Sequence, residues 1–364
     1  RYISVTGVQT CALPIFGLTL DGLLTVGASN AKLAKGQAVA HSVILHHLPA
    51  RSLAAAVMGP ESGPTAPRSR IPGLAELAAR EHVLALAMAH DGCRWKSAGC
   101  AAGCLAWAGH GGMSVPVAAA RARRTLAMLA HPAVYSRAVL WAIARAYRQA
   151  QRMGLPLAVR LRGTDDTPWH QQRLTLSPAE AQRLARRYGM PAVPGDGQTL
   201  AEALQLVPDC ELYDYSKAPV SGPLGLLAQR TAGWDVTASL AADRPHGILE
   251  AIRAVQAGFR LAVPVAMPKG AALPPVLILD RGGLSVRLRC IDGDQTDCRW
   301  LDPAGPQPGG CDGVAVLLRT KTSRGRGPAA DAFSLAPVWD RWQPLAGGGR
   351  ALLTAGEPWQ PLPA

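Results

Sequence analysis

The clearest pattern in the sequence is a long segment, beginning at Ser114, in which apolar residues recur every three or four positions. Apolar residues at this spacing line one face of a helix, and arginines occupy many of the remaining positions. Pro132 is expected to divide the segment into two helices, because proline breaks a helix when it stands in the interior. Gly154 is expected to end the second helix.

Downstream of Gly154, short apolar runs alternate with helical patterns. Ser177-Pro-Ala-Glu180 has the residues of a helix capping box with proline in the first turn. This alternation predicts a parallel sheet with crossover helices, either a partial (β/α) barrel or an open, mostly parallel sheet. The expected strands are 155–161, 212–215, 235–240 and 260–265, and the expected helices are 177–188, 200–206 and 247–257.

The part of the chain before Ser114 has weaker patterns. Residues 17–50 indicate short strands and turns, with a polar turn at 29–36. Residues 59–72 are rich in Pro, Gly and Ser, which predicts a surface loop. Residues 75–90 are apolar at helical spacing and predict a helix.

The two ends of the chain are treated separately from this core. Residues 1–16 resemble the translation of a sequencing adapter and are left out of the fold prediction as an artefact. Residues 303–364 are rich in Pro and Gly and predict an irregular C-terminal extension. A single α/β domain is therefore expected over residues 17–302, with a three-cysteine segment at 93–104.

Composition adds a strongly basic character. Lys and Arg together number 38 against 25 acidic residues, for a formal net charge of +13 over 364 residues. This excess favours non-specific attraction to nucleic acid, although abundant Arg, Ala, Pro and Gly with few Lys are also typical of a GC-rich genome. Only 3 Phe and 6 Tyr leave few platforms on which single-stranded bases could stack.

The sequence predicts a soluble, cytoplasmic protein without a membrane partner. No run approaches the roughly 18 apolar residues that a membrane-spanning helix needs. The 8 cysteines fall to an odd number without the adapter-like segment, which argues against a disulfide framework and favours a reducing compartment.

Three cysteines, Cys93, Cys100 and Cys104, lie within twelve residues and are candidate metal ligands. An iron–sulfur cluster held by three cysteines leaves one iron open to another ligand. Structural zinc would need a fourth ligand, for which His90 and His110 are candidates. Cys100 and Cys104 would share one face if a helix begins there. The simpler alternative is three small side chains that pack in an alanine-rich segment.

A glycine-rich turn follows the cysteine segment. Backbone N–H groups at Gly109 and Gly111, ahead of the arginines of the next helix, could bind an anion. The alternative, which we favour, is an ordinary turn before an exposed basic helix face.

Charged residues mark the end of the first strand after Gly154. Arg160 and Arg162 lie in this strand, and Asp165 and Asp166 follow it. Active groups collect at the carboxyl ends of parallel strands, so the two carboxylates could act as acid and base and the arginines could bind a cofactor. A polar turn capped by an aspartate explains the same residues equally well.

The next strand ends in a similar way, with Asp214 and Lys217. These two residues could orient a substrate, and a structural salt bridge is an equal alternative. Asp292-Gly293 fits a hairpin turn better than a calcium-binding loop. His46 and His47 have no partner that their spacing suggests, and we expect them to be surface or core residues.

Several motifs in fixed order carry a family resemblance. They include Asn30-Ala-Lys-Leu-Ala-Lys-Gly36, Cys104-Leu-Ala-Trp-Ala-Gly, Arg160-Leu-Arg-Gly-Thr-Asp-Asp166 and Tyr213-Asp-Tyr-Ser-Lys217. Together they resemble the phage gene-product-88-like proteins over roughly residues 24–322. More distantly, the layout is similar to three-cysteine phage proteins allied to radical S-adenosylmethionine enzymes, which implies a partial barrel. Their usual spacing is Cys-x3-Cys-x2-Cys, whereas this chain has Cys-x6-Cys-x3-Cys, so the cofactor stays open.

Two functional hypotheses follow. The first is an iron–sulfur protein of phage origin that could also bind S-adenosylmethionine. Cys93, Cys100 and Cys104 would hold the cluster, and the charged residues at the strand ends would line its open side. The second is a non-enzymatic phage accessory protein with a structural zinc site and a basic surface that binds nucleic acid.

Overall fold

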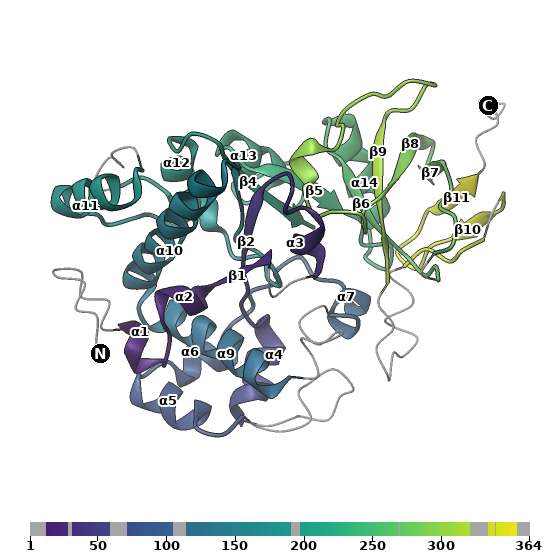
Figure 1. Ribbon diagram of the computed structural model, residues 1–364. Helices are drawn as coiled ribbons and strands as arrows, with labels where there is room; N and C mark the ends of the chain where they lie inside the picture. Colours follow the sequence, from purple (N-terminus) through teal and green to yellow (C-terminus); the bar gives the residue numbers. More distant parts are fainter. Residues whose placement is uncertain are drawn as a thin grey trace. The chain divides into compact units, whose positions relative to one another are not determined.

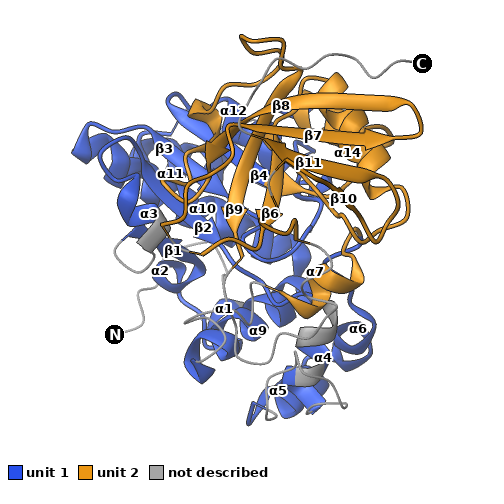
Figure 2. Cartoon of the chain, turned by 90° about the vertical axis from the view of Figure 1, so that its right-hand side faces the viewer, with its two compact units in different colours: residues 1–94, 105–214, 232–234 blue, residues 95–104, 215–231, 235–364 orange. Residues whose placement is uncertain are grey.

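The computed structural model describes residues 12–27, 31–58, 71–104, 114–190, 197–268, 270–320, 334–338 and 340–354. The chain divides into two compact units, where the sequence predicts one domain (Figure 2). Unit 1 comprises residues 1–94, 105–214 and 232–234, and unit 2 comprises residues 95–104, 215–231 and 235–364.

Unit 1 is built on a sheet whose strand order is β1-β2-β3-β4. Strands β2, β3 and β4 run parallel in chain order, with Val43 opposite Val159 and Val159 opposite Leu212, while β1 is antiparallel to β2. All five residues of β2 are buried, as expected for a strand covered on both faces. The strands are β1 (Leu24–Val26), β2 (His41–Leu45), β3 (Leu157–Arg160) and β4 (Cys210–Ser216), whose last two residues belong to unit 2.

The two long helices of unit 1 confirm the division at Pro132. Helix α9 (Val115–Ala130) ends before His131, and α10 (Pro132–Met153) begins with proline in its first turn. Gly154 caps α10 in the left-handed conformation, which glycine adopts without strain. Helix α10 packs against β2 and β3, and α4, α5 and α6 pack against α9 (Figure 1).

The shorter helices of unit 1 include α11 and α12, both of which begin with a capping box. The predicted helix at 75–90 is instead two helices, because His82 takes a positive φ between them. The predicted polar turn at 29–36 contains a helix as well. The bounds are α1 (Ala12–Ile15), α2 (Leu20–Leu23), α3 (Ala31–Lys35), α4 (Ala50–Met58), α5 (Leu74–Arg80), α6 (Leu84–Ala89), η2 (Trp169–Gln171), α11 (Pro178–Tyr188) and α12 (Leu200–Gln205).

Unit 2 contains strands in the order β5-β6-β9-β8-β7-β11-β10. Strands β5, β6, β9 and β8 are parallel, and the remaining pairings are antiparallel. Helix α14 packs against β5 to β9. The bounds are α7 (Ala98–Ala102), α13 (Leu226–Thr231), β5 (Asp235–Ser239), α14 (Gly247–Gln256), β6 (Leu261–Val265), β7 (Val276–Arg281), β8 (Leu284–Asp292), η3 (Arg299–Leu301), β9 (Gly313–Arg319), β10 (Trp342–Pro344) and β11 (Arg350–Thr354).

The prediction of an α/β fold with an open, mostly parallel sheet and crossover helices is confirmed. The described strands do not close into a barrel, so the barrel alternative is not adopted. The hairpin turn predicted at Asp292-Gly293 is wrong, because β8 and β9, on either side of it, are parallel. The β7–β8 hairpin turns instead at Gly282 and Gly283, which both have positive φ.

Ordered structure also reaches into both end segments. The expected irregular extension, 303–364, contributes β9, β10 and β11, and β9 is an inner strand with a buried run from Gly313 to Leu317. Within the adapter-like segment, Leu13 and Phe16 are buried. No helix of the described residues is both long and apolar enough to cross a membrane.

Candidate functional site

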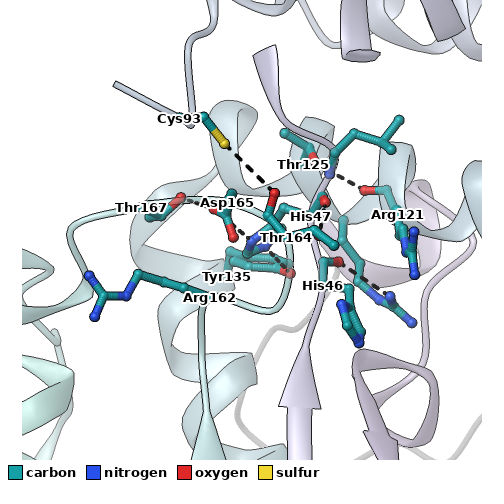
Figure 3. A network of polar contacts seen from close by, with 12 residues as sticks. His46, His47, Cys93, Arg121, Thr125, Tyr135, Arg162, Thr164, Asp165 and Thr167 are labelled. Atoms are coloured by element: carbon teal, nitrogen blue, oxygen red, sulfur yellow. Dashed lines mark hydrogen bonds and ion pairs between the residues drawn. The ribbon is translucent and has the colours of Figure 1, made fainter. Parts of the chain in front are cut away.

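The carboxyl ends of β2 and β3 form one edge of the unit 1 sheet, and the polar side chains of unit 1 converge there (Figure 3). Hydrogen bonds join the segments that directly follow β2 and β3, which we call the strand exits. Gly163 N donates to Leu45 O at 2.9 Å, and Thr164 Oγ1 donates to His47 O at 2.5 Å. We call His47, His90, Cys93, Tyr135 and Asp165 the edge site.

A buried His47–Asp165 pair lies at the centre of the edge site. His47 Nδ1 lies 3.3 Å from Asp165 Oδ2, and neither side chain is exposed. The other ring nitrogen, Nε2, is 2.9 Å from the hydroxyl of Tyr135. Thr167 Oγ1 donates to Asp165 Oδ2, and the indole ring of Trp169 stacks on the His47 imidazole at 6.0 Å. Residues of α10, of η2 and of the segment after β3 therefore fix the position of the pair.

His90 reaches the same carboxylate across Gly92. A Cβ atom added at Gly92 would lie 2.8 Å from His90 Nε2 and 3.5 Å from Asp165 Cβ, so both groups pack against the bare glycine. The backbone is closed at this point, because Asp166 N donates to Gly92 O at 2.5 Å. Cys93 Sγ follows immediately and points to Thr164 O, 3.7 Å away (Figure 3).

Besides His47 Nδ1, which lies 3.3 Å from Asp165 Oδ2, two polar atoms of the edge site have no hydrogen-bond partner among the described residues. They are Asp165 Oδ1 and His90 Nε2, and both are buried. Buried polar atoms are nearly always paired with protein or ordered water, and leaving one unpaired costs about 1–3 kcal/mol. A bound molecule could therefore form hydrogen bonds with the carboxylate oxygen of Asp165 and with the ring nitrogen of His90.

The electrostatics of the edge site keep Asp165 ionised. Burial alone would raise the pKa of Asp165, but the charge and contact of His47, the Thr167 hydroxyl and His90 together lower it below the usual 3.8. Burial lowers the pKa of His90, although Asp165 opposes this, so the imidazole is neutral near pH 7. Burial raises the pKa of Tyr135, whose phenol stays protonated.

The backbone of His46 and its neighbours is fixed by α9. Arg124 Nη1 donates to His46 O at 3.3 Å, and Leu48 N donates to Thr125 Oγ1 at 2.9 Å. The pKa of His46 lies well below the usual value because the ring is desolvated and Arg121, Arg160 and Arg124 surround it. The strand exit is thus rigid, as a site with preset geometry requires.

Asp214 lies in a separate cluster of unit 1. Its carboxylate accepts from Arg160 Nε at 3.2 Å and from Arg162 N at 2.8 Å, and Arg162 Nε lies 3.3 Å away. Arg162 also stacks over Trp234, with 4.8 Å to the ring centroid. Burial raises the pKa of Asp214, which the two guanidinium groups oppose. Asp214 thus lies in ion pairs with these two arginines, and its predicted part in orienting a substrate stays a prediction.

Lys217 belongs to unit 2, where it borders a cavity of about 220 Å³. This cavity lies at the carboxyl end of β5 and at the start of α14, with Trp95, Arg244 and Glu250 in its wall. Arg244 Nη1 is held by Trp95 O at 3.0 Å. Lys217 is thus at a strand end, as predicted, but not in the same unit as Asp165.

The three predicted metal ligands fall in different units. Cys93 is in unit 1, whereas Cys100 and Cys104 are in unit 2. Helix α7 ends at Ala102, so Cys104 is beyond the helix that carries Cys100. Within the described ranges, no three His, Cys, Asp or Glu side chains are grouped so that they could hold a metal ion. The three-cysteine metal site stays a prediction, and we derive no step of the chemistry through it.

For the remaining predicted residues, the structure gives at most their position and burial. Gly109 and Gly111, and His110 between them, lie outside the described residues. Asp166 contributes its backbone N–H to the Gly92 turn and its side chain is half-buried. His47 is the residue that sequence reasoning missed, and its position directly after the apolar run of β2 is the signal that could have identified it.

Unit 1 has the organisation of a class of α/β proteins in which parallel strands in chain order carry polar groups at their carboxyl ends. The chain belongs to the gene product 88 family, whose family model matches residues 56–327. This match confirms the resemblance and contains the whole edge site except His47. The comparisons give no support to the radical S-adenosylmethionine relationship. No curated protein and no solved structure matches the chain.

Proposed function

We propose that the chain is an enzyme that binds a small polar substrate at the edge site and exchanges protons with it through Asp165 and His90. The observation that carries this proposal is the pair of buried, unpartnered atoms, Asp165 Oδ1 and His90 Nε2, on either side of Gly92. A molecule with a hydroxyl or amino group would donate to Asp165 Oδ1 and pair with the imidazole at the same time.

The roles of the remaining groups follow from their burial. His47 and Tyr135 are enclosed, so they act on the substrate only through Asp165, by orienting its carboxylate and keeping it charged. His90 is less enclosed and neutral, which suits a general base near neutral pH. Ionised Asp165 accepts a hydrogen bond and stabilises the positive charge that His90 acquires when it takes a proton.

Two histidine variants test whether the edge site is functional or only structural. His90→Leu is expected to leave the free energy of unfolding unchanged or raise it, because it removes an unpaired buried nitrogen. His47→Leu in the same site is the matched control and should lower the free energy of unfolding by about 2 kcal/mol or more, because the buried Asp165 carboxylate loses its contact with His47 Nδ1. Urea unfolding followed by circular dichroism measures both.

The same variants connect stability with binding. A panel of small alcohols and amines screened by thermal shift should contain compounds that raise the Tm of the wild type but not that of His90→Leu. Equal destabilisation by His90→Leu and His47→Leu, with no compound that distinguishes them from the wild type, would contradict the proposal.

A second candidate function is the predicted iron–sulfur or zinc site of Cys93, Cys100 and Cys104, with S-adenosylmethionine as a possible further cofactor. It is favoured by the exposure of these side chains, since none of the three is fully buried, unlike small side chains that merely pack. The candidate rests on sequence spacing and on these thiols alone. The cytoplasmic location inferred from cysteine usage stays a prediction.

Metal analysis tests this candidate. Anaerobic reconstitution with iron and sulfide is expected to yield bound iron, sulfide and visible absorbance that are lost in Cys100→Ala. Cys210→Ala is the matched control, because this partly buried cysteine of β4 lies outside the trio and should leave the spectrum unchanged. Zinc without iron would favour the structural-zinc form, and identical metal content in both variants would reject the trio as ligands.

A further inference from the structure

A strongly basic hollow lies between α10 and α11 of unit 1, away from the residues of the edge site. It has a volume of about 490 Å³, which is within the range of ligand-binding cavities. We call it the arginine hollow, and its lining consists of Arg145, Arg148, Gln149, Arg152, Arg187 and Tyr188.

The arrangement follows from helix geometry. Positions 145, 148, 149 and 152 are spaced i, i+3, i+4 and i+7, so they form one exposed stripe along α10. The opposite face of α10 is buried by residues such as Leu140 and Ile143. Arg187 adds a fourth guanidinium from the last turn of α11.

Some of these guanidinium groups are already oriented. Arg148 Nη1 donates to Arg187 O, and the Arg187 guanidinium lies 5.6 Å from the centroid of the Tyr188 ring. Tyr188 is itself packed edge-on against Trp141 at 5.8 Å, so the floor of the hollow is fixed. Oriented arginines lose less side-chain entropy on binding an anion than free ones.

The negative ends of the helix dipoles do not neutralise the positive charge of the arginine hollow. The C-terminal turns of α10 and α11 each carry about half a negative charge, and Arg145 is paired with Asp21. Three further arginines therefore face roughly one negative charge from the two helix dipoles. The lining residues include no carboxylate, so an excess of about two positive charges is left for an anionic partner.

We propose that the arginine hollow binds the phosphodiester backbone of double-stranded nucleic acid without reading its sequence. The arginine stripe extends over seven residues of helix, about 10 Å at 1.5 Å per residue, which matches roughly three successive phosphates along one strand. Arginine pairs with phosphate oxygens in bidentate geometry, and contacts to phosphate carry no direct sequence information. This proposal does not depend on the edge site.

The test compares two triple variants with the same loss of charge. Arg148→Gln, Arg152→Gln and Arg187→Gln together remove three guanidinium groups of the hollow. Arg186→Gln, Arg253→Gln and Arg289→Gln together remove three exposed arginines that do not line it. Binding to a fluorescent 20-base-pair DNA duplex is measured by anisotropy between 50 and 200 mM salt, and circular dichroism confirms that each variant is folded.

The hollow variant is expected to bind at least about tenfold more weakly, and its salt dependence should fall by about 2–3 in the slope of log K against log salt. The matched control should change affinity by less than about threefold. Arg152→Gln alone should already weaken binding by about threefold.

Three outcomes would overturn the proposal. Equal losses in the two triple variants would mean that net charge alone attracts DNA, and an unchanged affinity in the hollow variant would place binding elsewhere. Competition by a nucleoside triphosphate as effective as duplex DNA at equal phosphate concentration would assign the hollow to free polyphosphates.

Discussion

Replacing Asp214 by alanine is expected to lower the free energy of unfolding by about 3–5 kcal/mol. The carboxylate is fully buried and is the shared partner of Arg160 and Arg162, whose side chains are 14% and 1% exposed. Removing it takes the Asp214 carboxylate away from both guanidinium groups and also removes the acceptor of the Arg162 N–H. Urea unfolding monitored by circular dichroism measures the change.

The control for this variant is Asp280→Ala, which breaks a more exposed ion pair with Arg350 in unit 2. Partly exposed pairs contribute about 0–1 kcal/mol, so its effect should be several times smaller. The loss of stability in Asp214→Asn should be intermediate between those of Asp214→Ala and Asp280→Ala, because the amide oxygen can still accept from Arg162 N. An Asp214→Ala protein as stable as Asp280→Ala would show that the cluster does not support the unit 1 sheet.

Gly163→Ala is expected to cost about 1–3 kcal/mol and to disturb the edge site. An added Cβ would lie 2.3 Å from His46 Nδ1 and 2.6 Å from Ile44 Cγ2, and the Ile44 methyl group cannot move without its strand. The exits of β2 and β3 must therefore separate, which strains the bond from Thr164 Oγ1 to His47 O. Because Cys93 Sγ is packed against Thr164 O, its alkylation by iodoacetamide should accelerate several-fold.

Peptide mapping by mass spectrometry measures the alkylation of Cys93 separately from the other cysteines. Gly222→Ala in unit 2 is the control, since its added Cβ meets nothing within 4 Å and only its positive φ is strained. It should lower stability modestly and leave the rate at Cys93 unchanged. The same Cys93 rate in Gly163→Ala as in the wild type would contradict the close approach of the two strand exits.

Local sequence signals predicted much of the fold because they act over a few residues. Pro132 and Gly154 set the ends of the long helices, and Ser177 begins α11 through its capping box. The region before Ser114 was less predictable. Its elements are short, and the breaks between them depend on backbone conformations such as the positive φ of His82. No residue pattern in the sequence predicts this conformation.

The candidate site was predicted in part. The rule that polar groups collect at strand ends named Asp165 as a candidate, but it could not pair Asp165 with His47, because the two are 118 positions apart and follow different strands. The same rule assigned Asp214 to an open rim. Its burial against Arg160 and Arg162 depends on how β3 and β4 pair, which local sequence does not contain.

The sequence by itself determined the fold class, the order of most helices and strands from Ser114 to Val265, and the family, because periodicity, capping residues and ordered motifs are properties of neighbouring residues. Only the tertiary structure decided that His47, His90 and Asp165 meet, that Asp214 pairs with both Arg160 and Arg162, and that four arginines of α10 and α11 line one hollow. The physical reason is that partners for buried charges come from long-range strand pairing and helix packing.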